Sequence, residues 1–343
     1  MRPDVLFTGF ASIHGKGALG GLPVSGSPGK PQLIDRWPTR RPRRAFLVPA
    51  FRPGDIAPGL RTRRMDRLSE WALVGSVLAL QDAAIDPVTL DRDRTAVVCG
   101  TAFGCLERTE EFLAAVSRNA ASADPIVFPE TLSNQPGSHV ARHFGLRGPN
   151  LTIDAGHVSG EVALVQAVSL LQSGQADRVL VLAGDLLTQC LYEWYEAAWL
   201  LEPECFEDQR HARRAGRPTI VPSEGLAACV LETSELAEAR QGRAHGRYHS
   251  GWLGSFEDST DGTPELDATA LLRRMRTSEE PREVEVMVSP NREFGAFGGS
   301  GLLQVGLALA RLRDTTRGYV MVAGLARHRR QAATVLLARE GRR

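Results

Sequence analysis

Short apolar runs alternate along the chain with longer segments in which apolar residues recur every three or four positions. The short runs are rich in β-branched residues, which is typical of buried strands. They predict strands at 5–10, 95–102, 151–154, 178–184, 226–232, 284–290, 319–325 and 333–339. The longer segments predict helices at 65–84, 107–118, 135–144, 158–173 and 300–312. This alternation predicts an α/β protein with a mixed or parallel sheet.

Two stretches interrupt the alternation. Residues 15–60 are rich in Gly, Pro and Arg, and residues 241–283 are polar with clusters of glycine and charge. Both are interpreted as irregular excursions from the core. The two halves of the chain share a coarse order of strands around one long buried helix, which indicates a duplicated fold.

Composition narrows the classes of function. The 343 residues allow about two domains of ordinary size. With 41 basic and 40 acidic side chains the net charge is +1, so nucleic acid is not indicated as a partner. The five cysteines are odd in number and form no C-x-x-C pair, which favours a reducing cytoplasm over a disulfide framework or a zinc site. We expect neither a signal peptide nor a membrane span, because no apolar run is long enough.

Several long motifs follow one another in a specific order. They read RRMDRLSEWALVGSVLALQDAAIDP (63–87), VVCGTAFGC (97–105), FPETLSNQPGSHVARHFGLRGPNLTIDAGHVSGEVAL (128–164), SGQADRVLVLAGD (173–185) and SEGLAACVLE (223–232). Together they resemble the landmarks of the β-ketoacyl synthases, and after residue 232 only GAFGGSGLLQVGLALA (295–310) and the closing strands are recognisable. The resemblance implies a thiolase-like fold of five layers, αβαβα, with two similar halves. We expect the N-terminal half at 1–175 and a shortened C-terminal half at 176–343.

The segment GPNLTIDAGHVSG (148–160) predicts a strand that ends at a glycine-rich bend and continues into a helix. A side chain at that helix start faces the positive end of the dipole, where a thiol loses its proton easily. The resemblance implies that active relatives carry a cysteine there, which takes the acyl chain as a thioester, whereas this chain has His157. It also implies two catalytic histidines and a lysine. Gly295 aligns with one histidine, Pro290 with the lysine, and no H-G-T follows residue 232.

His157 has two interpretations. It can be a new nucleophile or base, supported by Glu161 one turn along the helix. Alternatively, a neutral ring fills the volume that the thiol left and donates to a backbone carbonyl or to Glu161. The helix field opposes the protonated imidazole, and the family positions for a second acid or base are vacated, so we favour the second interpretation.

The resemblance implies roles for two further groups of residues. Phe103 aligns with a side chain that borders the deep end of the acyl tunnel in related synthases, where a phenyl ring would shorten or block the tunnel; the alternative is ordinary core packing. Arg61, Arg63 and Arg64 align with a basic stretch that receives acyl carrier protein, and guanidinium groups suit its acidic surface. The alternative is ordinary surface charge, since the whole chain is rich in arginine. We expect no bound cofactor and no metal, because the substrates of the family arrive on the phosphopantetheine of acyl carrier protein.

The chain resembles the chain-length factors, in which a synthase scaffold is retained and the nucleophile is replaced, although these commonly have Gln at the bend. Chain-length factors pair with an active β-ketoacyl synthase in type II polyketide, aryl polyene and related pathways and shape the acyl tunnel. We therefore predict a non-condensing cytoplasmic subunit that dimerises with a synthase or with itself, through the strand near 178–184. The alternatives are an acyl-thioester hydrolase or acyltransferase that uses His157, and a homodimeric pseudo-enzyme that binds acyl groups.

Overall fold

The computed structural model describes residues 3–23, 30–34, 36–37, 43–202, 219–255, 284–289, 295, 297–314, 318–326 and 331–339. Pro290 and the segment 256–283 lie outside this description. Among the described helices, none is both long and apolar enough to cross a membrane.

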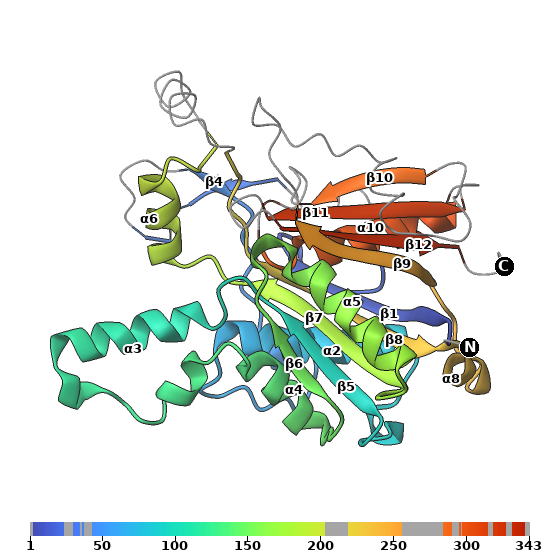
Figure 1. Ribbon diagram of the computed structural model, residues 1–343. Coiled ribbons are helices and arrows are strands. Elements are labelled where there is room, and N and C mark those ends of the chain that lie inside the picture. The colour runs from blue at the N-terminus through green and yellow to red at the C-terminus, as the bar shows by residue number, and fades with distance from the viewer. Residues whose placement is uncertain are drawn as a thin grey trace.

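One mixed sheet runs through the molecule (Figure 1). Its strands, in spatial order, are β10 (Val284–Ser289), β11 (Tyr319–Ala326), β12 (Gln331–Ala338), β9 (Gly246–Ser255), β1 (Val5–His14), β8 (Gly225–Thr233), β7 (Arg178–Asp185), β5 (Thr95–Gly100) and β6 (Asn150–Ile153). A further strand, β2 (Gly17–Gly20), pairs with β1, and β3 (Gln32–Leu33) pairs separately with β4 (Arg44–Ala45). We call β1, β8, β7, β5 and β6 the first-half sheet and β9 to β12 the second-half sheet; they meet where β1 pairs with β9.

The helices cover the sheet on several sides. They are α1 (Pro53–Ile56), α2 (Arg67–Asp82), α3 (Leu106–Arg118), α4 (Gln135–Phe144), α5 (Ser159–Gln172), α6 (Gln189–Ala197), α8 (Ser234–Ala239) and α10 (Ser300–Asp314). Short 3₁₀ turns are η1 (Pro87–Thr89), η2 (Ala120–Ser122), η3 (Phe128–Thr131) and η4 (Gly156–Val158). Helix α3 projects away from the body in Figure 1, and the chain returns along it through η2 and η3.

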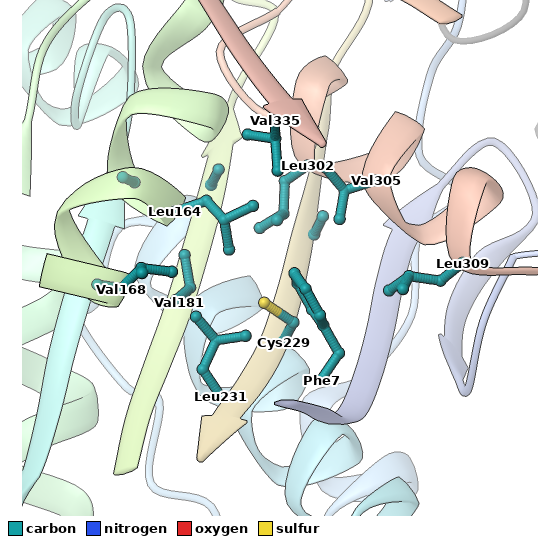
Figure 2. Close-up of a cluster of buried hydrophobic side chains, with 14 of the residues drawn as sticks. Phe7, Leu164, Val168, Val181, Cys229, Leu231, Leu302, Val305, Leu309 and Val335 are labelled. Atoms are coloured by element: carbon teal, nitrogen blue, oxygen red, sulfur yellow. The ribbon is translucent and has the colours of Figure 1, made fainter. Parts of the chain in front are cut away.

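The core explains why these segments form layers. Along β7, Val179 and Val181 pack on one face of the first-half sheet while Leu180 and Leu182 pack with α2 on the other. A strand buried on both faces needs apolar residues at successive positions. Figure 2 shows the first of these clusters, in which Val181 lies beside Val168 of α5 and the same cluster continues to side chains of α10. The predicted α/β class is confirmed, and α5 and α10 form its central layer.

Three sequence predictions differ from the structure. Strand β9 lies within the stretch that was expected to be irregular, and β2 to β4 lie within 15–60. Strand β7 was expected at the dimer edge, which is wrong, because it lies between β5 and β8. The outer strand of the first-half sheet is β6. The division into halves at 175/176 stays a prediction.

Candidate functional site

The Ser159 hydroxyl and the conformation of Gly156 hold the bend between β6 and α5. Gly156 adopts a left-handed φ of 61°, which glycine allows without strain. The Ser159 hydroxyl lies 2.6 Å from the carbonyl oxygen of Gly156 and 2.9 Å from that of Thr101, and it accepts the Ala155 N–H at 3.0 Å. These bonds fix the backbone of the bend to the end of β5 without using the side chain at position 157.

His157 is half-buried in η4, at the place where the sequence predicted it. The edge of the Phe103 ring faces it, with the ring centroids 6.4 Å apart and the planes at 71°. The hydrogen bond to Glu161 that both interpretations of His157 allowed is not formed, since neither carboxyl oxygen of Glu161 has a hydrogen-bond partner in the described part of the chain. The structure therefore brings Phe103 and His157 together but forms no hydrogen bond between Glu161 and the imidazole.

Glu161 is fully buried behind the bend. Its carboxyl group packs on Gly301 of α10 and Gly324 of β11, where an added Cβ atom would overlap it. Burial in this notch raises the pKa of Glu161 to about 8, because the charged form loses its hydration and no described residue hydrogen-bonds to it. Glu161 is therefore a neutral carboxylic acid at pH 7.

Asp185, at the end of β7, accepts hydrogen bonds from two of the loops around the bend. Its buried carboxylate accepts hydrogen bonds from the Thr101 hydroxyl at 2.6 Å and from the N–H groups of Ala102 at 2.9 Å and Phe103 at 3.0 Å. It also accepts from the N–H of Gly298, which precedes α10. Burial raises the pKa of Asp185 to about 6, although these donors act in the opposite direction. Sequence reasoning missed this residue; an acidic residue that ends an apolar strand was the available signal.

A buried tyrosine also packs against the Phe103 ring. The rings of Phe103 and Tyr195 are 6.4 Å apart at 83°. Tyr195, on α6, is 3% exposed, and its hydroxyl has no hydrogen-bond partner among the described residues. It escaped the sequence analysis because α6 was not predicted.

The remaining predicted positions are three arginines in an exposed loop and Gly295, where the family histidine would not fit. Arg61, Arg63 and Arg64 are exposed in the loop before α2, so the structure leaves their predicted docking role open. Gly295 has a left-handed φ of 71°, and an added Cβ would lie 2.7 Å from the side chain of Ser223. A histidine at position 295 would therefore need the backbone to move.

A cavity of about 450 Å³ opens beside the start of α2 and does not include His157. Arg36 and Arg67 line it and pair with the buried Glu224. No group of three or more His, Cys, Asp or Glu side chains that could hold a metal occurs in the described segments.

Comparison with known proteins places these features in a family. Residues 39–237 match the β-ketoacyl synthase N-terminal domain. Putative polyketide β-ketoacyl synthase 1 from Streptomyces halstedii is 33% identical over 189 residues, which cover 52% of this chain and 44% of that protein. The matched segment thus spans less than half the length of this curated relative.

Solved structures match almost the whole chain. The ishigamide ketosynthase/chain length factor superposes with a TM-score of 0.81 at 17% identity, covering 99% of this chain and 100% of that one. A type II polyketide acyl carrier protein in complex with its ketosynthase, AntDE:AntF, gives 0.76 at 17% identity with the same coverage. At these identities the likeness concerns the fold, and it confirms the thiolase-like architecture expected from the sequence.

Proposed function

Because the chain belongs to the β-ketoacyl synthase family, we propose that it is a non-condensing, ketosynthase-like subunit that pairs with an active synthase. The pathway is a type II polyketide, aryl polyene or fatty-acid-like pathway of the cytoplasm, and the acyl groups arrive on acyl carrier protein. One observation carries the proposal: the nucleophile bend is intact as backbone but holds His157 in place of a thiol.

The chemistry around His157 supports a scaffold over a catalyst. An imidazole that takes up an acyl group or a proton becomes cationic, and a neighbouring carboxylate normally stabilises that charge. Glu161 does not supply it, because its carboxyl is neutral at pH 7 and bonds to nothing in the described chain. The start of α5 adds a positive dipole end that disfavours the imidazolium. The alternative of a hydrolase or acyltransferase built on His157 therefore has no support from these contacts.

The pairing surface we propose has a polar and an apolar part. Strand β6 is the outer strand of the first-half sheet. The carbonyl oxygens of Pro149 and Ile153 bond to β5, so the N–H and C=O groups of Thr152 point outward. An uncovered edge of this kind invites a second strand.

The apolar part is the arm, residues 106–132, which projects from the body in Figure 1. The arm is closed on itself by Phe112 and Phe128, whose ring centroids are 5.5 Å apart. It nevertheless exposes a set of large apolar side chains, namely Leu113, Ile126, Phe128 and Leu132. The edge of β6 and the arm together suit the interface of a permanent complex, which typically buries more than about 2,000 Å² in total. The occupant we propose is an active β-ketoacyl synthase subunit.

The two remaining roles follow from this pairing. Arg61, Arg63 and Arg64 are exposed and so are available to hold an acidic carrier protein. Phe103 stands beside His157 with its backbone held by Asp185, so its ring limits the space that an acyl chain can enter past the bend.

Co-expression with candidate synthases that retain the cysteine and both histidines tests the proposal. We expect native mass spectrometry to find a one-to-one complex. Ile126→Asp should weaken the complex because it puts a charge in the apolar arm surface, whereas Val88→Asp, at an exposed site on η1, should not. Thr152→Pro removes an outward N–H and should weaken the complex as well.

The isolated chain, incubated with acyl- and malonyl-carrier substrates, should form no β-ketoacyl product. Formation of that product would overturn the proposal, and an acyl adduct on His157 would favour the enzyme alternative. A stable homodimer that binds none of the synthases would favour the homodimeric pseudo-enzyme.

A further inference from the structure

Tyr195 is a buried phenol whose hydroxyl lacks a hydrogen-bond partner among the described residues. Leaving a buried hydroxyl unpaired costs roughly 1–3 kcal/mol, and native proteins seldom tolerate it without a reason. Tyr192, one turn earlier on α6, is also fully buried but has the backbone amide of Arg43 as a partner. The unpaired state is therefore particular to Tyr195 and is not general to the tyrosines of this helix.

The position of Tyr195 links it to the bend. Its ring meets the edge of Phe103, and Phe103 in turn meets His157, with 6.4 Å between centroids at each step. Phe103 is thus the ring that contacts both His157 of the bend and Tyr195 of α6. A group that displaces the Phe103 ring from beside His157 therefore comes next to Tyr195.

Phe103 has a fixed backbone and a side chain that is only half-buried. Its N–H is held by Asp185 at 3.0 Å. The next residue, Gly104, has a left-handed φ of 63° and is packed against Ser133. An acyl chain can therefore pass Phe103 only if the phenyl ring rotates, while the loop that carries the ring stays in place.

We propose that Tyr195 donates a hydrogen bond to an oxygen atom carried along a bound acyl chain, so that the site selects oxygenated, polyketide-like chains over saturated ones. The inference rests on the proposed function, in which this chain borders the acyl tunnel, and it names the substrate class of that tunnel. A saturated chain would leave the phenol unpaired, as it is in the structure. A ketone oxygen loses water on entry and regains a hydrogen bond only if the phenol supplies it.

Two matched probes test the proposal on the full-length chain. They are 5-oxohexanoyl-pantetheine and hexanoyl-pantetheine, which have the same chain length and differ by one ketone. Isothermal titration calorimetry should show that the wild type binds the keto probe about five to ten times more tightly, as expected for one net hydrogen bond.

Variants assign the preference to the hydroxyl. Tyr195→Phe should bring the two affinities together without lowering the melting temperature, because the hydroxyl bonds to none of the described residues. Tyr192→Phe is the matched control: it should keep the preference and lower the melting temperature, because the bond to the Arg43 amide is lost. Phe103→Ala should tighten binding of both probes and keep their ratio.

Equal affinity of the wild type for both probes would overturn the inference, as would a preference that survives Tyr195→Phe. Absence of binding to both the wild type and Phe103→Ala would overturn it too. These outcomes are separate from the proposed function, which is judged by complex formation with a synthase. If the chain selects the keto probe but pairs with no synthase, the proposed function is wrong and the inferred role of Tyr195 stands.

Discussion

Glu161→Gln should remove a pH dependence from the stability of the protein. The buried carboxyl has a pKa of about 8 in the folded chain, against 4.5 for an ordinary glutamate. The folded state therefore keeps a proton that the unfolded chain releases. The stability that this proton contributes is complete below pH 4.5 and is lost as the pH rises through 8.

The magnitude follows from the size of the shift. At 1.36 kcal/mol per pKa unit, the rise from 4.5 to about 8 corresponds to about 5 kcal/mol in total. Of this stabilisation, about 2 kcal/mol is lost between pH 4.5 and pH 6, and about 3 kcal/mol is lost between pH 6 and pH 9. Glutamine has nearly the shape of the protonated acid and no charge to bury. The free energy of unfolding of the variant, relative to that of the wild type, should therefore rise by about 3 kcal/mol between pH 6 and pH 9.

Urea unfolding of both proteins at pH 6, 7.5 and 9 measures this difference, provided that the slopes with denaturant agree. The interval above pH 6 is chosen because the stability change linked to Asp185, whose pKa rises from 3.8 to about 6 on folding, falls mainly below that pH. Glu238→Gln, at an exposed position of α8, is the control and should follow the wild type. Parallel curves for the wild type and Glu161→Gln from pH 6 to pH 9 would refute the reasoning, because they would mean that the carboxyl is ionised or paired.

Other predictions concern the same architecture. Gly301→Ala should destabilise by about 1–3 kcal/mol, because its methyl overlaps the Glu161 carboxyl, and adding Glu161→Ala should restore part of the loss in thermal melts. Asp185→Asn should lower the unfolding free energy by about 1–3 kcal/mol at pH 8 in urea titrations, because an amide cannot accept from all four donors. Glu232→Gln should cost about 3–5 kcal/mol by the same assay, because it leaves two arginines without their buried carboxylate. His157→Cys should fold but yield no condensation product by mass spectrometry, and appreciable product would contradict the proposed function.

The sequence predicts most of the elements because most carry their own pattern. All of the predicted strands and helices are present, with ends displaced by a few residues. Strand β9 was missed because GRYHSGWLGS has no continuous apolar run. It is held by backbone pairing to β12 on one side and to β1 on the other, and a sequence pattern does not display backbone pairing. Helix α6 is short, yet its buried Leu191, Tyr192 and Tyr195 have helical spacing that could have been recognised.

The candidate site was predictable at the bend and not beyond it. The strand, the glycine turn and the helix are adjacent in the chain, so a local pattern predicts them. The contacts of Asp185 with the loops before α3 and α10, and the notch of Gly301 and Gly324 around Glu161, join residues far apart in sequence. No local pattern shows that the Asp185 carboxyl has four donors whereas the Glu161 carboxyl has none among the described residues.

The backbone of the bend and the chemistry of the family depend on different residues. Ser159 and Asp185 hold the bend and its neighbouring loops through backbone groups, so the side chain at position 157 can change without disturbing them. Position 295 behaves in the opposite way, because its left-handed backbone is packed against Ser223 and leaves no room for a larger side chain. Restoring a thiol at the bend would therefore take one substitution, whereas restoring the histidine at 295 would require the surrounding backbone to move. That asymmetry is why we expect exchanges at His157 to change what the site holds without making it a condensing site.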